Sequence, residues 1–501
     1  MSLFLFCVAL LIAGYFIYGA FIERVFGIRP ERQTPALTQA DGVDFMTMPK
    51  WKLWLIQLLN IAGTGPIFGP ILGALYGPVA MLWIVVGCIF AGAVHDYFCG
   101  MISIRNGGAS IPHMAGRYLG QPAKHFINIL ALLLLVLVGA VFVTSPAGLL
   151  TQITEQVLGR TGEITQKGNP THDGLVQIWV VIIFVYYIVA TLLPIDKIIG
   201  RIYPLFGALL MFMTAGMMFG LLFEGIPLFR TVGLENGVSF SDFFKNFQPN
   251  PNLPIWPMIF LTISCGALSG FHATQTPMMA RCAANEREGR FVFYGAMITE
   301  GVIALIWCMV GLSFYDDVQA LQAAIKAGTP SKVVFDAAVS MLGTFGGILA
   351  VLGVVVLPIT SGDTAFRAAR LQIAEFFKFS QRSLQNRLMI TVPLFLIGGW
   401  LTTVDFGVLW RYFNWANQTT ATVMLWVAGA YLYTHRKLHW ICTIPALLMT
   451  QVTIMFLSFN AQMGFGLSWT ASFIIGALVS GTFLLLFLKL LKPVNPETTD
   501  D

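Results

Sequence analysis

NIAGTGPIFGP, residues 60–70, interrupts one apolar segment with glycine, proline and threonine, and SCGALSGFHATQTP, residues 264–277, interrupts another. Glycine is costly inside a helix, and an interior proline removes a backbone hydrogen bond. In hydrocarbon, such a break persists only where protein or a water-filled cavity satisfies the freed backbone groups. A matched pair of broken helices is typical of secondary transporters, in which substrate and ions bind between two halves.

The composition indicates a polytopic membrane protein. The 501 residues have a mean hydropathy of +0.76, and only 11% are charged, whereas soluble domains carry about 25% charged residues. The net charge of +5 is spread over short loops, which argues against nucleic-acid binding. The seven cysteines show no C-x-x-C or His/Cys spacing, so we expect neither disulfides nor a metal site.

Apolar runs of spanning length predict about thirteen transmembrane helices. They fall at 3–22, 51–77, 78–104, 124–145, 174–194, 198–223, 254–277, 291–314, 333–360, 385–404, 418–434, 438–458 and 466–490. The first run lacks a basic n-region and a cleavage site, so we expect a retained helix. With the N-terminus outside, 22 of the 29 Lys and Arg residues lie in inward-facing segments. This bias predicts an outside N-terminus and an inside C-terminus.

In this topology the two interrupted segments run in opposite directions, and four helices follow each of them. The pattern predicts an all-α protein with an inverted five-plus-five repeat, the LeuT-type arrangement, over 51–223 and 254–434. An N-terminal helix and cytoplasmic loop, 1–50, precede the repeats. Two peripheral helices and a short cytoplasmic tail, 435–501, follow them.

Several motifs resemble the carbon starvation protein A (CstA) family. They are NIAGTGPIFGP, GAVHD (92–96), GALSGFH (266–272), YGAMITEG (294–301) and PITSGDTAFRAARL (358–371). The resemblance implies a LeuT-type transporter of the bacterial cytoplasmic (inner) membrane that takes up peptides or pyruvate during nutrient limitation. It also implies no cofactor beyond a coupling proton or sodium ion.

The breaks are the predicted substrate site. A half-helix that begins inside the membrane presents the partial positive charge of its N-terminus, which suits a carboxylate. Phe271 is a candidate gate, and His272 a candidate donor or proton carrier. The predicted substrate residues are Gly63, Thr64, Gly65, Ser269, Gly270, Phe271 and His272. Gly69, Gly73 and Gly77 instead form a small-residue row that favours close helix packing.

Polar residues in the later segments are candidates for ion coupling. By resemblance to the LeuT-type fold, hydroxyls near residue 360 face the first break and help to hold sodium. The alternative for Asp363 is an N-cap that opens a surface helix. Ionisable groups near the bilayer midplane are usually functional, which makes Glu300 a candidate. The coupling candidates are Thr360, Ser361, Asp363, Thr364, Glu300, His95 and Asp96.

Other interpretations of the polar residues are weaker. Adjacent helical residues point about 100° apart, so His95 and Asp96 need not share a partner. A metal site made from these two with His272 and Glu300 lacks H-E-x-x-H-type spacing. The charges of 281–290 are interpreted as a solvated loop.

The leading hypothesis is thus a proton- or sodium-coupled importer of a small carboxylate, either a short peptide or pyruvate, rather than an enzyme. An intramembrane hydrolase lacks a nucleophile motif in this sequence, and a nutrient sensor lacks an output domain. The choice between peptide and pyruvate, and between proton and sodium, stays open at this point.

Overall fold

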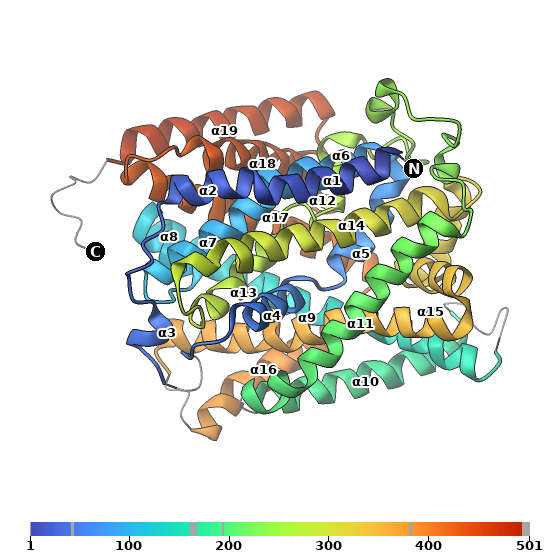
Figure 1. Ribbon diagram of the computed structural model, residues 1–501, viewed down its shortest axis with the longest axis horizontal. Helices are drawn as coiled ribbons and strands as arrows, with labels where there is room; N and C mark the ends of the chain where they lie inside the picture. The colour runs from blue at the N-terminus through green and yellow to red at the C-terminus, as the bar shows by residue number, and fades with distance from the viewer. Residues whose placement is uncertain (1, 42–44, 161–167, 193–194, 380–382, 493–501) are drawn as a thin grey trace.

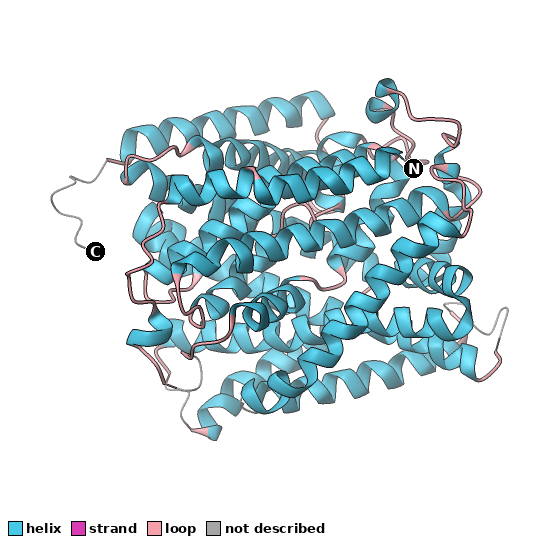
Figure 2. Ribbon diagram, in the orientation of Figure 1, coloured by secondary structure: helices cyan, strands magenta, loops and turns pink. Residues whose placement is uncertain are grey.

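The computed structural model describes residues 2–41, 45–160, 168–192, 195–379 and 383–492, and within these ranges it contains helices and no strand (Figure 2). The predicted all-α class is confirmed. The end of the expected segment 174–194 and residues 493–501 of the expected cytoplasmic tail lie outside the described ranges.

The first half of the chain begins with two consecutive helices and then forms a group that opens with a broken helix (Figure 1). Its helices are α1 (Ser2–Phe16), α2 (Tyr18–Phe26), α3 (Pro35–Thr38), α4 (Lys50–Ile61), α5 (Gly65–Gly73), η1 (Ala74–Tyr76), α6 (Val79–Gly87), η2 (Cys88–Gly92), α7 (Ala93–Arg105), α8 (Ile111–Leu119), α9 (Gln121–Val157), α10 (Pro170–Leu192) and α11 (Ile195–Phe223). After the α4–α5 pair, four long helical segments follow: α6 to α7, α9, α10 and α11.

The second half repeats this order after a connection that holds two short 3-10 turns, η4 (Arg230–Val232) and η5 (Phe240–Phe244). Its helices are α12 (Ile255–Thr262), α13 (Gly270–Ala280), η6 (Glu286–Glu288), η7 (Arg290–Tyr294), α14 (Gly295–Ser313), α15 (Val318–Phe377), α16 (Leu384–Leu401), α17 (Phe406–Thr434), α18 (Trp440–Phe459) and α19 (Trp469–Leu490). The broken pair α12–α13 is again followed by four long helices, α14 to α17.

The predicted number of thirteen spans is not confirmed. Within the described ranges, nine helices are long and apolar enough to cross a membrane, or ten if α4 and α5, bent by 51°, count as one. The expected segments 254–277, 385–404 and 418–434 correspond to α12–α13, α16 and α17, which are shorter or more polar. The expected segment 333–360 is only part of α15, which contains non-helical residues at Gly328, Thr329 and Gly343.

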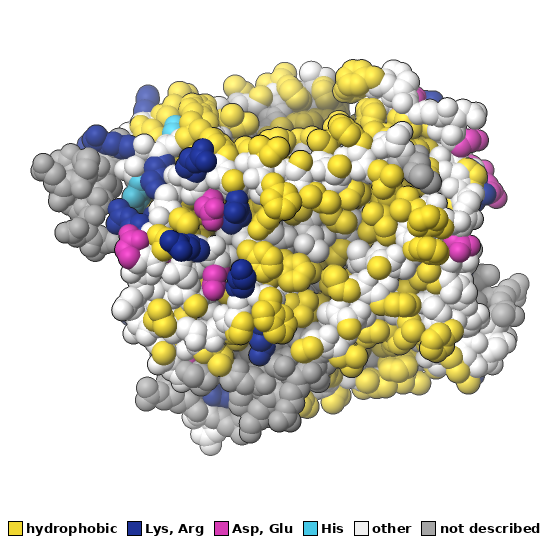
Figure 3. Space-filling model, viewed as in Figure 1, with side chains coloured by type: hydrophobic (Ala, Val, Ile, Leu, Met, Phe, Trp, Pro, Cys, Tyr) yellow, Lys and Arg dark blue, Asp and Glu magenta, His cyan; other side chains and the backbone are white. Residues whose placement is uncertain are grey.

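Burial distinguishes central from peripheral helices. The most apolar window is 83% buried in the span that contains α14, but only 17% buried in α10 and 22% buried in α19. The exposed faces of the peripheral helices carry large apolar side chains, as a lipid-facing surface requires. Figure 3 shows this apolar surface over most of one face, with Lys and Arg gathered at one end.

Each group also contains a π-helical turn in the helix that follows its break. These turns are η2, between α6 and α7, and η7, directly before α14. In η2, a Cβ at Gly92 would lie 2.3 Å from the carbonyl oxygen of Ala267, so the turn presses against the second break. Single π-turns inside α-helices are frequent at functional sites.

Candidate functional site

The first break spans Ala62 to Thr64, between α4 and α5. Gly63 lies against α9, because a Cβ there would meet the ring of Phe142 at 2.1 Å. On the same helix, the Ser145 hydroxyl donates to the hydroxyl oxygen of Thr64 at 3.4 Å. The break predicted from residues 60–70 is therefore present, and α9 lines it with one aromatic and one polar side chain.

The second break lies between Thr262 and Gly270, where Gly266 has a positive φ of 82°. Amide side chains of α17 satisfy much of it. Asn417 Oδ1 accepts hydrogen bonds from the Ser269 hydroxyl at 3.2 Å and from the Phe271 N–H at 2.6 Å. Such partners are what a break inside the membrane needs.

Two further α17 amides act in the same way. Asn414 Oδ1 accepts from the Ser264 hydroxyl at 2.6 Å. Gln418 Nε2 donates to the carbonyl oxygens of Phe260 and Leu268 at 2.9 and 3.0 Å. Sequence reasoning missed these amides because it began the segment at residue 418, although three amides within NWANQ, residues 414–418, were a visible signal.

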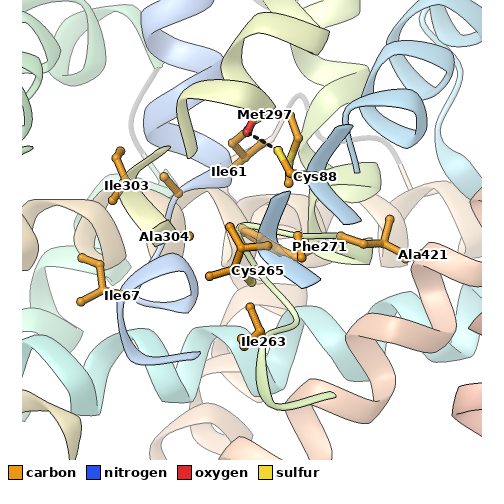
Figure 4. Close-up of a cluster of buried hydrophobic side chains, with 14 of the residues drawn as sticks. Ile61, Ile67, Cys88, Ile263, Cys265, Phe271, Met297, Ile303, Ala304 and Ala421 are labelled. Atoms are coloured by element: carbon orange, nitrogen blue, oxygen red, sulfur yellow. Dashed lines mark hydrogen bonds between the residues drawn. The ribbon is translucent and has the colours of Figure 1, made fainter. Parts of the chain in front are cut away.

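The two breaks touch one another. A Cβ at Gly65 would lie 2.3 Å from Cys265 Sγ, and one at Gly69 would lie 2.9 Å from the Thr262 carbonyl oxygen. Gly73 meets the Ile263 side chain in the same way, so the packing role predicted for these two glycines is confirmed. Figure 4 shows Cys265 and Phe271 within the apolar cluster that surrounds this contact.

A row of four buried ionisable side chains runs beside the second break. Asp96 of α7 stands at its centre, with Oδ1 at 2.8 Å from His95 Nδ1 and Oδ2 at 2.8 Å from His272 Nδ1. His272 Nε2 lies 3.2 Å from Glu300 Oε2, and Glu300 Oε1 accepts the Gly266 N–H at 3.1 Å. All four side chains have zero exposure.

The row adds a contact that the sequence left open. Adjacent helical residues need not share a partner, and in the structure His95 and Asp96 contact each other directly. The Asp96 carboxylate bridges the two imidazoles because its oxygens point to opposite sides. The row thus joins α7 of the first group to α13 and α14 of the second, and it ends on the backbone of the break.

The hydroxyl cluster of α15 divides into two parts. The hydroxyls of Thr360 and Ser361 donate to the Leu59 carbonyl oxygen, at 3.0 and 3.1 Å, at the end of α4. Thr364 instead donates back to its own helix. Asp363 Oδ1 lies 3.9 Å from Arg367 Nη2, whose nearer partner is the Ala190 carbonyl oxygen at 2.6 Å.

The alternative for Asp363, an N-cap of a surface helix, is wrong. The residue lies in the interior of α15, and its side chain is buried. The helix continues because residues 361–370 pack against other helices rather than against water. Tyr187 of α10 contacts this region, with its hydroxyl 2.8 Å from the Pro358 carbonyl oxygen.

The loop 281–290 is also less solvated than expected. Glu286 is fully buried, and its carboxylate receives two hydrogen bonds from Arg105, at 3.0 and 2.9 Å. The Arg29 N–H donates to the same carboxylate at 2.7 Å. This ion pair ties the second group to the end of α7.

The sequence matches a known protein family. The model of the family described as carbon starvation protein CstA matches residues 1–159 and 147–338. The chain belongs to the CstA family. The predicted resemblance is thereby confirmed over more than half of the sequence.

Individual relatives of this CstA-family protein carry membrane or transporter names. An uncharacterized membrane protein of Haemophilus influenzae is 62% identical over 349 residues, which cover 65% of this chain and 94% of that protein. The peptide transporter CstA of Bacillus subtilis is 25% identical, with 84% and 83% covered. The pyruvate/proton symporter BtsT of Escherichia coli is 29% identical over 60% of this chain, which matches only 47% of that symporter.

The solved structures support the fold. The structure of MhsT in complex with L-phenylalanine superimposes with a TM-score of 0.58 at 14% identity, and it covers 88% of this chain and 98% of MhsT. The predicted LeuT-like fold is confirmed, whereas the number of thirteen helices is not. The three relatives carry the names of transporters or membrane proteins rather than of enzymes.

Proposed function

We propose that this chain is a secondary active importer of a small carboxylate-bearing nutrient, a short peptide or pyruvate, that works by alternating access. The observation that carries the proposal is the buried row from His95 to Glu300, which ends on the Gly266 N–H of the second break. Ionisable groups are expensive inside a membrane and mark proton or ion pathways. The names of the relatives agree with transport of this class of substrate.

The substrate carboxylate binds at the first break in this proposal. The first turn of a helix leaves N–H groups without intrahelical partners. In α5 the second residue is Pro66, which has no N–H. The Ile67 and Phe68 N–H groups bond to the Thr64 carbonyl oxygen, so the Gly65 N–H is the first-turn donor for the carboxylate. At the second break, the Phe271 N–H is already taken by Asn417. Phe271 instead contributes its ring, which meets the Phe142 ring edge-on at 5.8 Å and closes the site on its apolar side.

The position of Glu300 supports coupling to protons. A hydrogen bond to a charged carboxylate is stronger than one to the neutral acid. A proton that moves along the row onto Glu300 therefore weakens its bond to the Gly266 N–H. The protonation state of the row is in this way linked to the conformation of the second break, as proton-driven alternating access requires.

Sodium coupling is the second candidate, supported by a different observation. The oxygens of Leu59, Thr360 and Ser361 converge at the end of α4, and hard cations bind clusters of oxygen ligands. Asp363 and Thr364 lie on the next turn of α15 and act on this cluster only through the helix. We further propose that the protein lies in the bacterial cytoplasmic membrane with its N-terminus outside, as its loop charges predict, and acts in carbon starvation.

Uptake into proteoliposomes tests these proposals. Labelled pyruvate and a labelled dipeptide are offered separately under an imposed proton or sodium gradient. We expect Glu300→Gln to abolish accumulation driven by protons while it retains exchange of internal for external substrate, because exchange moves no net proton. Undiminished proton-driven accumulation by Glu300→Gln contradicts the role of the row.

Matched variants separate the alternatives. Thr299→Val, which removes a hydroxyl that bonds only within α14, is the control for Glu300. Loss of sodium-driven uptake in Thr360→Val/Ser361→Ala supports the second candidate. Recovery of a chemically cleaved dipeptide would favour a hydrolase, and binding without accumulation under either gradient would favour a sensor.

A further inference from the structure

A second polar site lies away from the breaks, at the end of the molecule where Lys and Arg gather (Figure 3). It is a pocket of about 970 Å³, formed where α2, α7, α8, α17 and α19 end. The loop charges assign this end to the cytoplasm. Nothing in the proposed transport mechanism uses it.

Seven of the residues that line the pocket are cationic. The first half of the chain supplies Arg29, Arg32, Arg105 and Arg117. The second half supplies Arg436, Lys437 and Lys492. Because these side chains come from five separate places in the sequence, folding brings them together against their mutual repulsion.

Little negative charge offsets this cluster. In the described part of the chain, no Asp or Glu lines the pocket, and Arg105 is the lining cation with a carboxylate salt bridge, to Glu286. Arg117 donates to the neutral Asn106 side chain at 2.8 Å, and Lys437 donates to the neutral Phe26 carbonyl oxygen. A pocket with uncompensated cations is electrostatically complementary to an anion.

The titration of Lys437, which lies in the connection between α17 and α18, agrees with this excess of positive charge. Burial, together with the nearby Arg105 and Arg29 cations, lowers the pKa of Lys437 to about 8.

Neutral hydrogen-bond donors also line the pocket. The Tyr431 hydroxyl accepts a hydrogen bond from Arg105 at 2.8 Å, so its own proton is left to donate into the pocket.

The surroundings of the pocket identify the kind of anion. Its lining also includes the apolar residues Ile28, Leu490 and Leu491. α2 ends next to the lining residue Gly27, and α19 ends at the lining residue Leu490. Both helices carry lipid-facing side chains such as Phe21 and Leu486, which are 38% and 48% exposed. A ligand with both a phosphate and acyl chains therefore meets cations in the pocket and apolar surface beside it.

We propose that this pocket binds the phosphate headgroup of an anionic phospholipid from the cytoplasmic leaflet, with its acyl chains along α2 and α19. Basic pockets between transmembrane helices on this side of a membrane suit such headgroups. A soluble phosphate compound offers the same anionic group without the chains, so the two sources are distinguishable. The full chain in nanodiscs of zwitterionic lipid, with or without phosphatidylglycerol or cardiolipin, is the material for the test.

Native mass spectrometry then counts retained lipid. We expect the wild type to keep anionic lipid, and Arg32→Gln/Arg436→Gln/Lys492→Gln to lose affinity by about tenfold or more, because each surface cation contributes to headgroup binding. Arg105 is left intact since it holds Glu286. The matched control is Lys52→Gln/Lys124→Gln/Arg287→Gln, which removes the same charge at inward-facing positions outside the pocket.

Retention that is equal in both triple variants overturns the proposal. In a second arm, inorganic pyrophosphate and glycerol 1-phosphate are titrated into nanodiscs that contain only zwitterionic lipid. Tight binding of either compound to the wild type, without retention of anionic lipid, overturns the lipid assignment in favour of a soluble phosphate ligand. Thermal unfolding of each variant in zwitterionic lipid shows whether it is folded. If the pocket triple variant does not fold, Arg436→Gln alone replaces it.

Discussion

A Cβ on Gly65 would lie 2.3 Å from Cys265 Sγ and 2.5 Å from Cys265 Cβ, so the two breaks meet at a point that has no room for a second side chain. The Cα of Cys265 is 3.9 Å from the same position. The contact therefore has space for one side chain, which Cys265 of the second break now fills. A side chain at position 65 of the first break would need the same space.

This sharing predicts a compensating pair of substitutions. Gly65→Ala is expected to destabilise the protein by about 1–3 kcal/mol, the usual cost of overpacking. Gly65→Ala/Cys265→Gly is expected to recover much of that loss, because it moves the side chain from one break to the other. Thermal unfolding of the four members of the double-mutant cycle measures the coupling, and additive effects would show that the contact is not shared.

At Gly270, the first residue of α13, a second substitution cannot compensate in this way. A Cβ there would meet the Asn417 carbonyl oxygen at 2.2 Å and the Ala421 nitrogen at 2.3 Å, both in the backbone of α17. Gly270→Ala must push two helices apart and is expected to cost about 3 kcal/mol or more and to abolish uptake. Gly481→Ala in α19, where a Cβ meets nothing within 4 Å, is the control and should leave the unfolding temperature unchanged or slightly raised.

Asn417→Ala removes the acceptor for the Ser269 hydroxyl and the Phe271 N–H. A buried donor left without a partner costs about 1–3 kcal/mol. We expect a lower unfolding temperature and impaired uptake, since the second break loses its support. Thr419→Ala on the same helix, whose hydroxyl bonds only to Trp415, should affect neither, and an equal effect of both variants would argue against a specific role for the amide.

The two histidines of the buried row are expected to differ. His272 contacts both Asp96 and Glu300, whereas His95 contacts Asp96 at one end of the row. His272→Gln should therefore lower proton-driven uptake by about tenfold or more, as expected for the loss of a hydrogen bond between charged groups. His95→Gln should have a smaller effect. The reverse order, measured as initial rates at equal protein content, would mean that protons do not pass through His272.

Lys437 gives a prediction for pH dependence. Its pKa is about 8 in the folded protein and 10.5 without burial, so between these values the unfolded chain binds more protons and stability rises with pH. Lys437→Met removes this contribution. The difference in unfolding temperature between Lys437→Met and wild type, in zwitterionic detergent, should shrink as pH rises from 8 towards 10, and a constant difference would contradict the lowered pKa.

The sequence could predict those features that a particular residue type marks directly, without knowledge of its neighbours in the fold. A helix break in a membrane requires Gly, Pro and small polar residues, so NIAGTGP and SCGALSG were visible, as was Glu300 in an apolar segment. The contact between His95, Asp96 and His272 was not predictable, because it depends on how α7 packs against α13. The π-turns and the Arg105–Glu286 pair depend on tertiary packing in the same way.

The start of α17 was predicted too late in the sequence, because polar residues inside the helix conceal its first turns from a hydropathy criterion. Asn414, Asn417 and Gln418 lower the hydropathy of this stretch, because their amides bond to the second break rather than face lipid. A hydropathy criterion therefore placed the start at residue 418 instead of Phe406. Polar residues inside a transmembrane helix thus indicate that this part of the helix packs against polar groups of the protein. They also make the helix look shorter to a hydropathy criterion than it is.

Thr360 holds the end of α4 by a bond that needs no heavy-atom movement to release. Its hydroxyl oxygen lies 3.0 Å from the Leu59 carbonyl oxygen but also 2.8 Å from that of Leu357 in its own helix. A hydroxyl has one proton, so rotation about a single C–O bond exchanges one acceptor for the other with no hydrogen bond lost. The Ser361 hydroxyl still donates to the same Leu59 carbonyl oxygen at 3.1 Å. The Thr360 part of this junction can therefore be released at little enthalpic cost, and its two states differ only in the direction of one proton.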